Sequence, residues 1–480
     1  MVPAETGFKK SLGFLDSTAL VAGSMIGSGI FIVSADIARN VGAPGWLLMV
    51  WVITGIMTIF AALSYGELAA MMPKAGGQYV YLREAFNPLA GFLYGWTFFT
   101  VIQTGTIAAV AMAFAKFAGV LVPWFSEKNI LLDLGFIHIN TVHLLAISMI
   151  IILTYNNLMG IKSGKWVQNI FTALKVLLLI GFIILGLFFA KNAGAVSINQ
   201  SYFWKPVSAD GTALIGWALV AAVCVSMVGS LFSADAWNSI TFAAGEVKNP
   251  RRNVPLGLVT GVTLVIVLYI LANMVYLNSL PLRGSAEGIS VFERGMQFAT
   301  NDRLGTASMY GLFGSVASLL MAIFVVVSTF GCNNGLILSG ARVYYAMAND
   351  RLFFQNAGKL NSRSVPAFGL IVQSFWACLL CLSGTYSDLL DYVVFAVLIF
   401  YVLTIAGLFV LRYKRPEAER PYKAFGYPVI PAFYIIAAFV VMVVLYMYKP
   451  VFTKRGLIIV LIGIPVYYIW QWWSSRKKAE

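Results

Sequence analysis

The chain has 480 residues, of which 60% are hydrophobic and only 11% are charged, and its mean hydropathy is +0.83. Soluble domains carry about 25% charged residues, so this composition excludes a soluble protein and indicates one that crosses a membrane many times. A net charge of +14 would suit a nucleic-acid partner, but the positions of the basic residues favour a different explanation.

About twelve apolar runs are long enough to span a bilayer, which takes roughly 20 helical residues. They lie near residues 15–39, 45–72, 88–121, 141–158, 166–190, 212–243, 254–277, 306–347, 366–383, 388–412, 428–448 and 456–473. When both termini are placed in the cytoplasm, about 21 of the 33 basic residues fall on the inner side, as the positive-inside rule requires. We therefore expect a multi-pass protein of the cell membrane, inner or plasma, with cytoplasmic termini, the lipid bilayer as a partner and no nucleic acid.

The first run is interrupted near its middle by glycines and serines, namely Gly23, Ser24, Gly27, Ser28 and Gly29. Each glycine costs about 1 kcal/mol relative to alanine inside a helix, so the cluster predicts that the backbone opens there. Open backbone at membrane depth must line a cavity or bind a ligand. The N–H groups that begin the second half-helix suit a carboxylate. Close helix packing is the alternative use of such glycines, but the clustering favours a transporter.

The sixth run has a second interruption, because residues 229–238 place Asp235 among small and polar residues at mid-depth. Paired breaks at matching positions of two five-span halves indicate an inverted repeat with a substrate site near the bilayer midplane. We expect a single membrane domain over residues 1–480. Residues 12–190 would form its first half, residues 212–412 its second half, and residues 425–473 two peripheral helices.

Cysteine and histidine usage argues against an enzyme. The four cysteines fall in predicted spans, and the two histidines lie near the outer end of the fourth span. A metal-dependent or haem enzyme of the membrane would need more ligands at depth. The sequence also lacks a recognisable nucleophile with its base and a phosphate-binding loop. We therefore expect no catalytic residues, no metal and no cofactor.

Five groups of residues follow one another in a fixed order. They are Gly27-Ser28-Gly29-Ile30-Phe31; Glu67 with Gly76-Gly77-Gln78-Tyr79; Val167-Gln168 with Phe171 and Lys175; the run from Phe232 to Asn238 with Glu246 and Asn249-Pro250; and Ser328-Thr329-Phe330-Gly331 with Asn334-Gly335. In this order they resemble the L-type amino acid transporters of the amino acid-polyamine-organocation (APC) superfamily, from about residue 12 to residue 430. The resemblance implies an all-α fold of two interlocked five-span inverted repeats with helices 1 and 6 broken, plus two peripheral helices.

The resemblance also implies a site for an amino acid zwitterion. N–H groups of the first break would bind the substrate carboxylate, and carbonyl groups of both breaks would bind its ammonium group, in agreement with the helix dipoles. The implied residues are Ile26, Gly27, Ser28 and Gly29 for the carboxylate; Ser24, Phe232, Ser233 and Asp235 for the ammonium; and Gly105, Ala109, Val397 and Leu398 for the pocket walls. Phe232 would be an aromatic gate, with packing as the alternative. Glu67 would be a cytoplasmic gate or a loop anchor, for which Arg342 is one candidate partner.

Lys175 is a basic residue well inside the fifth predicted span. A lysine at mid-bilayer costs about 2.5 to 3.5 kcal/mol, so a partner or a function should hold it there, although snorkelling toward the basic end of the span is an alternative. In sodium-dependent relatives a cation joins the first, fifth and eighth spans. The Lys175 ammonium could replace that cation by binding carbonyls near Val21 to Ser24 and the hydroxyls of Ser328 or Thr329. Sodium would then be dispensable.

The side chain of Asp235 has two possible roles. It could tie the sixth-span break to donors such as Asn238, or it could face the pocket and bind a cationic substrate side chain. We favour the tie, because the implied pocket walls are small and apolar.

The expected function is sodium-independent exchange of neutral L-amino acids by alternating access. A proton-coupled amino acid or amine symporter is the alternative. Residues 122–140 contain no cysteine, so we expect a bacterial-type member without a disulfide-linked heavy subunit.

Overall fold

A computed structural model describes residues 10–74, 76–133, 138–382 and 386–476, with the side chains of residues 161–169, 386–388 and 473–476 left undescribed. Val167 and Gln168 of the third sequence group therefore lie outside the described side chains. The described chain is almost entirely helical. Its two named strands, β1 (Ile130–Asp133) and β2 (His138–Asn140), form a small antiparallel hairpin in which Ile130 pairs with Asn140 and Asp133 with His138.

Within the described ranges, nine helical segments are long and apolar enough to cross a membrane. Seven are simple helices: α3 (Pro44–Met71), α7 (Thr141–Leu158), α12 (Pro250–Ser279), α15 (Ser315–Asn349), α17 (Tyr386–Lys414), α18 (Val429–Tyr448) and α19 (Pro450–Arg476). The other two contain π-helical turns: α5 (Pro88–Thr97), η2 (Phe98–Ile102) and α6 (Gln103–Leu121) are continuous, as are α8 (Ile161–Ile184) and η3 (Leu185–Phe189).

Three further apolar segments complete the predicted set. Two are the shorter helices α10 (Trp217–Ser233) and α16 (Ala367–Cys381), and the third is the broken segment α1 (Phe14–Met25), η1 (Gly29–Phe31) and α2 (Val33–Val41). The all-α polytopic fold is thus confirmed. One boundary differs, because the predicted run 306–347 is divided at Gly314 into α14 (Leu304–Phe313) and α15. Gly314 has a φ of 82°, a conformation that glycine adopts without strain.

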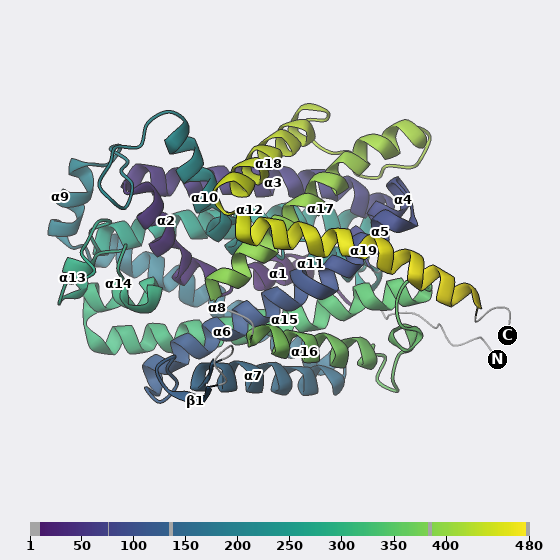
Figure 1. Cartoon of the computed structure of the whole chain (residues 1–480), viewed down its shortest axis with the longest axis horizontal. Coiled ribbons are helices and arrows are strands. Elements are labelled where there is room, and N and C mark those ends of the chain that lie inside the picture. The colour runs from purple at the N-terminus through teal and green to yellow at the C-terminus, as the bar shows by residue number, and fades with distance from the viewer. Residues whose placement is uncertain (1–9, 75, 134–137, 383–385, 477–480) are drawn as a thin grey trace.

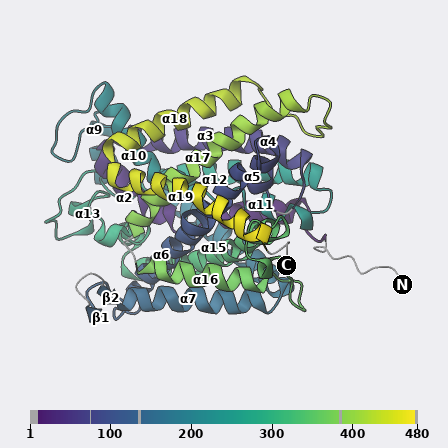
Figure 2. The same cartoon turned by 45° about the vertical axis from the view of Figure 1, so that its right-hand side comes forward.

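The remaining helices are short. They are α4 (Gln78–Ala85), α9 (Ala193–Ser201), α11 (Ser239–Phe242), η4 (Ala244–Glu246), α13 (Val291–Arg294), η5 (Thr300–Asp302) and η6 (Gln355–Gly358). Of these, α9 and α13 lie at one end of the bundle, next to α14, and α4 lies at the other end (Figure 1). Figure 2 shows the same division after a turn of the molecule by 45° about the vertical axis.

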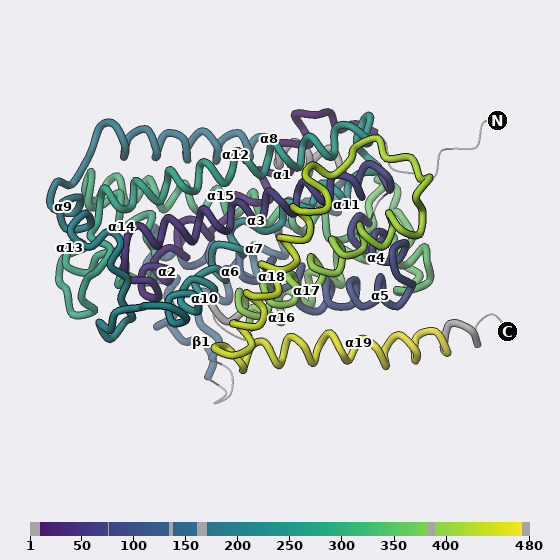
Figure 3. The backbone as a smooth tube through the Cα atoms, turned by 90° about the horizontal axis from the view of Figure 1, so that it is seen from above, coloured from purple at the N-terminus to yellow at the C-terminus, as the bar shows by residue number. Residues whose placement is uncertain are grey.

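The long helices run side by side between these ends. Helix α12 packs against α3 and α1, and α15 packs against α6 and α8, so the broken first segment lies among other helices. Helix α19 runs along the outside of the bundle and ends at the same side as α4 (Figure 3). We call this side the α4 end and the other side the α9 end. The core of the bundle is apolar, with fully buried residues such as Trp51, Tyr269 and Phe31.

Candidate substrate site at two broken helices

The first break begins where α1 ends. Ile26 has an extended backbone (φ −73°, ψ 90°), and its N–H donates the last helical bond, to the Ala22 carbonyl at 2.9 Å. The Gly27 N–H makes no backbone hydrogen bond to any described residue. The Ser24 hydroxyl is buried and likewise has no partner among the described residues. Since buried polar groups are nearly always paired, the break offers unused polar groups at the middle of the bundle.

The second break follows α10. The chain leaves the helix after Ser233, passes through Ala236 with a φ of 63°, and resumes as α11 at Ser239. A positive φ is uncommon for alanine and marks a constrained backbone. The Asp235 N–H donates to the Phe232 carbonyl at 3.1 Å, and Phe232 itself is buried in the last turn of α10. The structure thus has both interruptions that the sequence predicts.

The two breaks touch each other. A Cβ atom on Gly29 would lie only 2.9 Å from the Cα of Ser233, so glycine is required for this approach. Tyr269 of α12 joins the same two segments, because its hydroxyl lies 2.8 Å from the Met25 carbonyl and 3.2 Å from the Ser233 carbonyl. The sequence analysis missed Tyr269. Its only signal is a tyrosine in a long apolar run, which more often means packing.

Lys175 reaches the end of α1 from α8. Its ammonium donates to the Gly23 carbonyl and, at 2.9 Å, to the Ile26 carbonyl, and the residue is fully buried. The Ser328 hydroxyl of α15 donates to the same Ile26 carbonyl at 3.3 Å. The first, fifth and eighth predicted spans therefore meet here, but the Ser328 hydroxyl shares the Ile26 carbonyl with Lys175, whereas the sequence led us to expect it to bind the Lys175 ammonium directly. Snorkelling is contradicted, because the ammonium points into the bundle.

Thr329 does not take part in this contact. Its hydroxyl donates to the carbonyls of Val325 and Val326, at 2.8 and 3.0 Å, within its own helix. One residue along a helix rotates the side chain by about 100°, which explains why only one of the two neighbouring hydroxyls faces α1. Cys332, one turn further on, places its sulfur 3.1 Å from the Ser24 carbonyl.

Asp235 is tied to α17. The Tyr401 hydroxyl donates to its Oδ1 at 2.6 Å, whereas Asn238, the donor suggested from sequence, donates instead to the Gln78 side chain at 3.1 Å. A tie is therefore present, but its donor is Tyr401. The sequence could not indicate this pair, since 166 residues separate the two.

Two small cavities of about 20 Å³ each adjoin Asp235. A water molecule needs roughly 10 to 15 Å³ by this measure, so neither cavity holds an amino acid and the bundle is closed around the site. Val397 lines both cavities and Leu398 lines one, but polar side chains, Gln78, Gln103, Asn238 and Ser239, share the walls of the first. Two of the predicted apolar wall residues therefore line these cavities, together with polar side chains that the sequence did not indicate. Gly105 lies elsewhere, against Val393, and lines a separate cavity.

At the α4 end, Glu67 anchors the segment that follows α17. Arg412 binds both of its carboxylate oxygens, at 2.9 and 2.6 Å, and Arg420 lies 3.2 Å away. The Ala424 N–H donates to the same carboxylate at 2.7 Å. Arg342, the candidate partner from sequence, pairs instead with Glu246 at 2.6 Å. The Glu246–Arg342 pair is almost fully buried and joins the segment after α11 to α15.

A more exposed network lies beside these pairs. Glu84 of α4 accepts from Arg83 and Arg415, each at 3.0 Å, and Arg83 also binds Asp350 at the end of α15. Burial by itself would raise the pKa of Glu84, but the hydrogen bonds from Arg415 and Arg83 outweigh it and hold the pKa below its usual value. The carboxylate therefore stays ionised at neutral pH and keeps α4 attached to α17.

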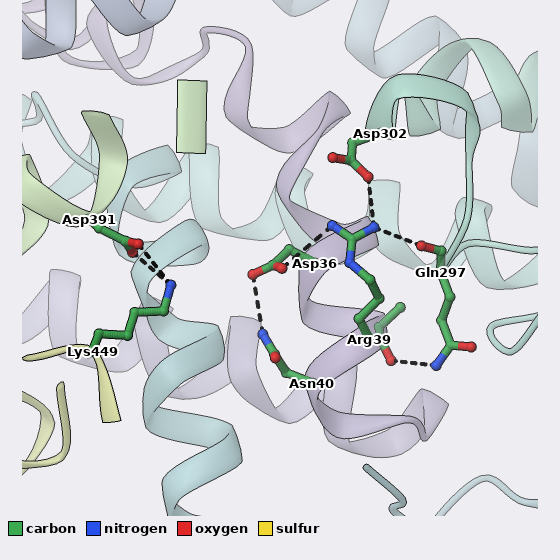
Figure 4. A network of polar contacts seen from close by, with 8 residues as sticks. Asp36, Arg39, Asn40, Gln297, Asp302, Asp391 and Lys449 are labelled. Carbon is green, nitrogen blue, oxygen red and sulfur yellow. Dashed lines mark hydrogen bonds and ion pairs between the residues drawn. The ribbon is translucent and has the colours of Figure 1, made fainter. Parts of the chain in front are cut away.

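The α9 end is also held by ion pairs (Figure 4). Arg39 of α2 lies 2.7 Å from Asp302 and 3.5 Å from Asp36, and it donates to the Gln297 carbonyl at 2.7 Å. These contacts join the second half of the broken first helix to the segment before α14. The side chains of Arg39 and Asp302 are about one third exposed and that of Asp36 about half, so each pair contributes little stability and can separate easily.

A membrane bundle in which two broken helices meet at its centre has the architecture of a secondary transporter. Comparison with known proteins agrees, because the family model for amino acid permeases matches residues 12–469. The chain belongs to the amino acid permease family of the APC superfamily.

Curated relatives of the L-type group cover nearly the whole chain. The chain is 29% identical to the b(0,+)-type amino acid transporter 1 of Oryctolagus cuniculus over 99% of its own length and 92% of the relative. It is 30% identical to the large neutral amino acids transporter small subunit 2 of Homo sapiens, over 98% of its own length and 82% of the relative. The resemblance seen in the sequence is therefore confirmed.

Proposed function

We propose that the protein is a sodium-independent exchanger of neutral L-amino acids that works by alternating access. The observation that carries this proposal is the Lys175 ammonium on the Gly23 and Ile26 carbonyls. A fixed positive charge on these carbonyls takes the place that a coupling cation would otherwise need to occupy. The relative named as a large neutral amino acids transporter supports the class of substrate.

In this proposal the zwitterion binds between the two breaks. Its carboxylate meets the N–H groups of residues 26–29 and the hydroxyl of Ser28, and the unpaired Ser24 hydroxyl and Gly27 N–H support that assignment. Its ammonium meets carbonyls of Ser24, Phe232, Ser233 and Asp235. Because Gly29 and Ser233 are in contact, the breaks must separate before a substrate enters. Phe232, beside the second break, closes over the bound substrate.

The two ends open in turn. Opening at the α4 end requires the Glu246–Arg342 pair to separate, while Glu67 keeps the segment after α17 attached to α3 through Arg420 and the Ala424 N–H. Opening at the α9 end requires the Arg39–Asp302 pair to separate. The proposed cytoplasmic side is the α4 end, in the cell membrane. The proposed transporter is a bacterial-type member that acts without a disulfide-linked heavy subunit, because residues 122–140 offer no cysteine.

The test is uptake of radiolabelled L-leucine into liposomes that contain the purified protein and internal L-leucine. Replacing sodium by choline should leave the initial rate unchanged. An imposed membrane potential should also have no effect, because exchange of two neutral zwitterions moves no net charge, whereas each uncompensated charge would couple at about 2.3 kcal/mol per 100 mV. A strict sodium requirement would refute the role given to Lys175, and stimulation by an inward proton gradient would favour the symporter instead.

A further inference from the structure

A third and larger cavity lies beside α19, on the outside of the bundle (Figure 3) and away from the breaks. It occupies about 540 Å³ where η2, α6, α16, α17 and α19 meet, compared with about 20 Å³ beside Asp235. Its walls are almost entirely apolar and include Trp96, Val101, Trp376 and Ile462. Cavities of roughly 300 to 1,000 Å³ with such walls are typical of sites for small ligands.

One end of this cavity is positively charged. Arg455, in the second turn of α19, lines it and is exposed, with its guanidinium 3.0 Å from the Tyr392 hydroxyl. Among the described residues Arg455 has no acidic partner, whereas nearby Lys449 is paired with Asp391 at 2.8 Å. From Arg455 to Ile462 the cavity follows α19 for about 10 Å, along the direction in which the helix crosses the membrane.

We propose that this cavity is a binding site for one phospholipid of the surrounding bilayer. An acyl chain fills the apolar part, and the anionic phosphate binds Arg455. The combination of an apolar hollow and a cation at one end matches an amphipathic anion such as a phospholipid, which the bilayer around α19 supplies.

The lipid site shares two walls with the proposed substrate site. In η2, Thr100 and Val101 face the lipid cavity, while Phe98 and Ile102 line the cavity beside Asp235. In α17, Val393 lines the lipid cavity and Val397 lines the cavity beside Asp235. Trp376 fixes the π-helical turn by donating to the Thr100 carbonyl at 3.0 Å. Occupation of the lipid site therefore sets the position of the substrate-site walls, an effect that rests on the proposed transport function.

Binding is tested by native mass spectrometry of the purified protein after titration with phosphatidylglycerol. Arg455→Gln should lower retention of the lipid by about tenfold, because a charge-assisted hydrogen bond is lost. Lys454→Gln is the matched control, since Lys454 lies over the Tyr446 ring and does not line the cavity. Ile462→Trp should fill the cavity and lower retention further, whereas Ile436→Trp, at an exposed position of α18, should not.

Equal retention by Arg455→Gln, Ile462→Trp and their controls would overturn the lipid site, as would retention of detergent or sterol alone. Because mass spectrometry does not depend on transport, this result is separate from failure of the proposed function. The coupling is tested by the KM for L-leucine in liposomes with and without phosphatidylglycerol. The lipid should shift the KM of the wild-type protein and leave that of Arg455→Gln unchanged, and a shift in neither protein would overturn the coupling.

Discussion

Lys175 and Ser328 reach the Ile26 carbonyl from two different helices, whereas the neighbouring Thr329 does not. We predict that Lys175→Ala lowers exchange by about tenfold or more, because hydrogen bonds from a charged group are worth roughly 1.5 to 3 kcal/mol. Ser328→Ala should lower the exchange rate less, and Thr329→Ala should leave it close to wild type. Initial rates per mole of monodisperse, reconstituted protein provide the measurement. Wild-type rates for Lys175→Ala would remove its proposed role.

The negative charge of Asp235 can be removed by a mutation that keeps its hydrogen-bond acceptor oxygen. In Asp235→Asn the side-chain oxygen can still accept from Tyr401, so we predict that uptake of alanine, serine and leucine falls by less than about tenfold. Tyr401→Phe should have a similar, moderate effect. Competition by arginine and lysine in the wild-type protein is the accompanying measurement. If these basic amino acids outcompete the neutral ones and only their uptake is lost in Asp235→Asn, Asp235 binds the substrate side chain.

At the scale of the elements, the contact of the two breaks makes a clear prediction. Gly29→Ala would place a methyl group 2.9 Å from the Ser233 Cα, so the breaks could not close and exchange should be lost. Gly181→Ala is a matched control in α8, where an added Cβ would meet nothing within 4 Å. That control should transport normally and gain a little stability, since alanine favours a helix by about 1 kcal/mol. Normal exchange by Gly29→Ala would contradict the proposed closure.

The elements were readable from the sequence because their causes are local. Apolar runs of spanning length predicted the helices, and clustered glycines predicted the first break. Pairs between distant segments were not readable, since nothing near Glu67 indicates Arg412, 345 residues away. The orientation of each helix about its own axis could not be predicted from the sequence either. Ser328 faces α1 and Thr329 does not. Gly105 faces α17 and not the cavities beside Asp235. Those outcomes depend on packing between helices.

For the molecule as a whole, the proposed transport cycle requires the buried Glu246–Arg342 pair to separate when the α4 end opens. Removing one partner of a buried ion pair costs about 3 to 5 kcal/mol, so Glu246→Gln should lower the melting temperature by several degrees and favour opening at this end. Glu419→Gln is the control, because its pair with Arg251 is mostly exposed and contributes little. Thermal unfolding in detergent compares the two variants. Equal melting temperatures would show that the pair does not stabilise the closed state.

Exchange is tested most directly by comparing L-leucine uptake into amino acid-loaded and empty liposomes. We predict rapid uptake into loaded liposomes and little above background into empty ones, because in the proposed exchange the transporter returns only with a bound internal amino acid. The same preparation, the same external L-leucine concentration and no sodium should be used in both arms. Equal initial rates into loaded and empty liposomes would contradict the exchanger assignment.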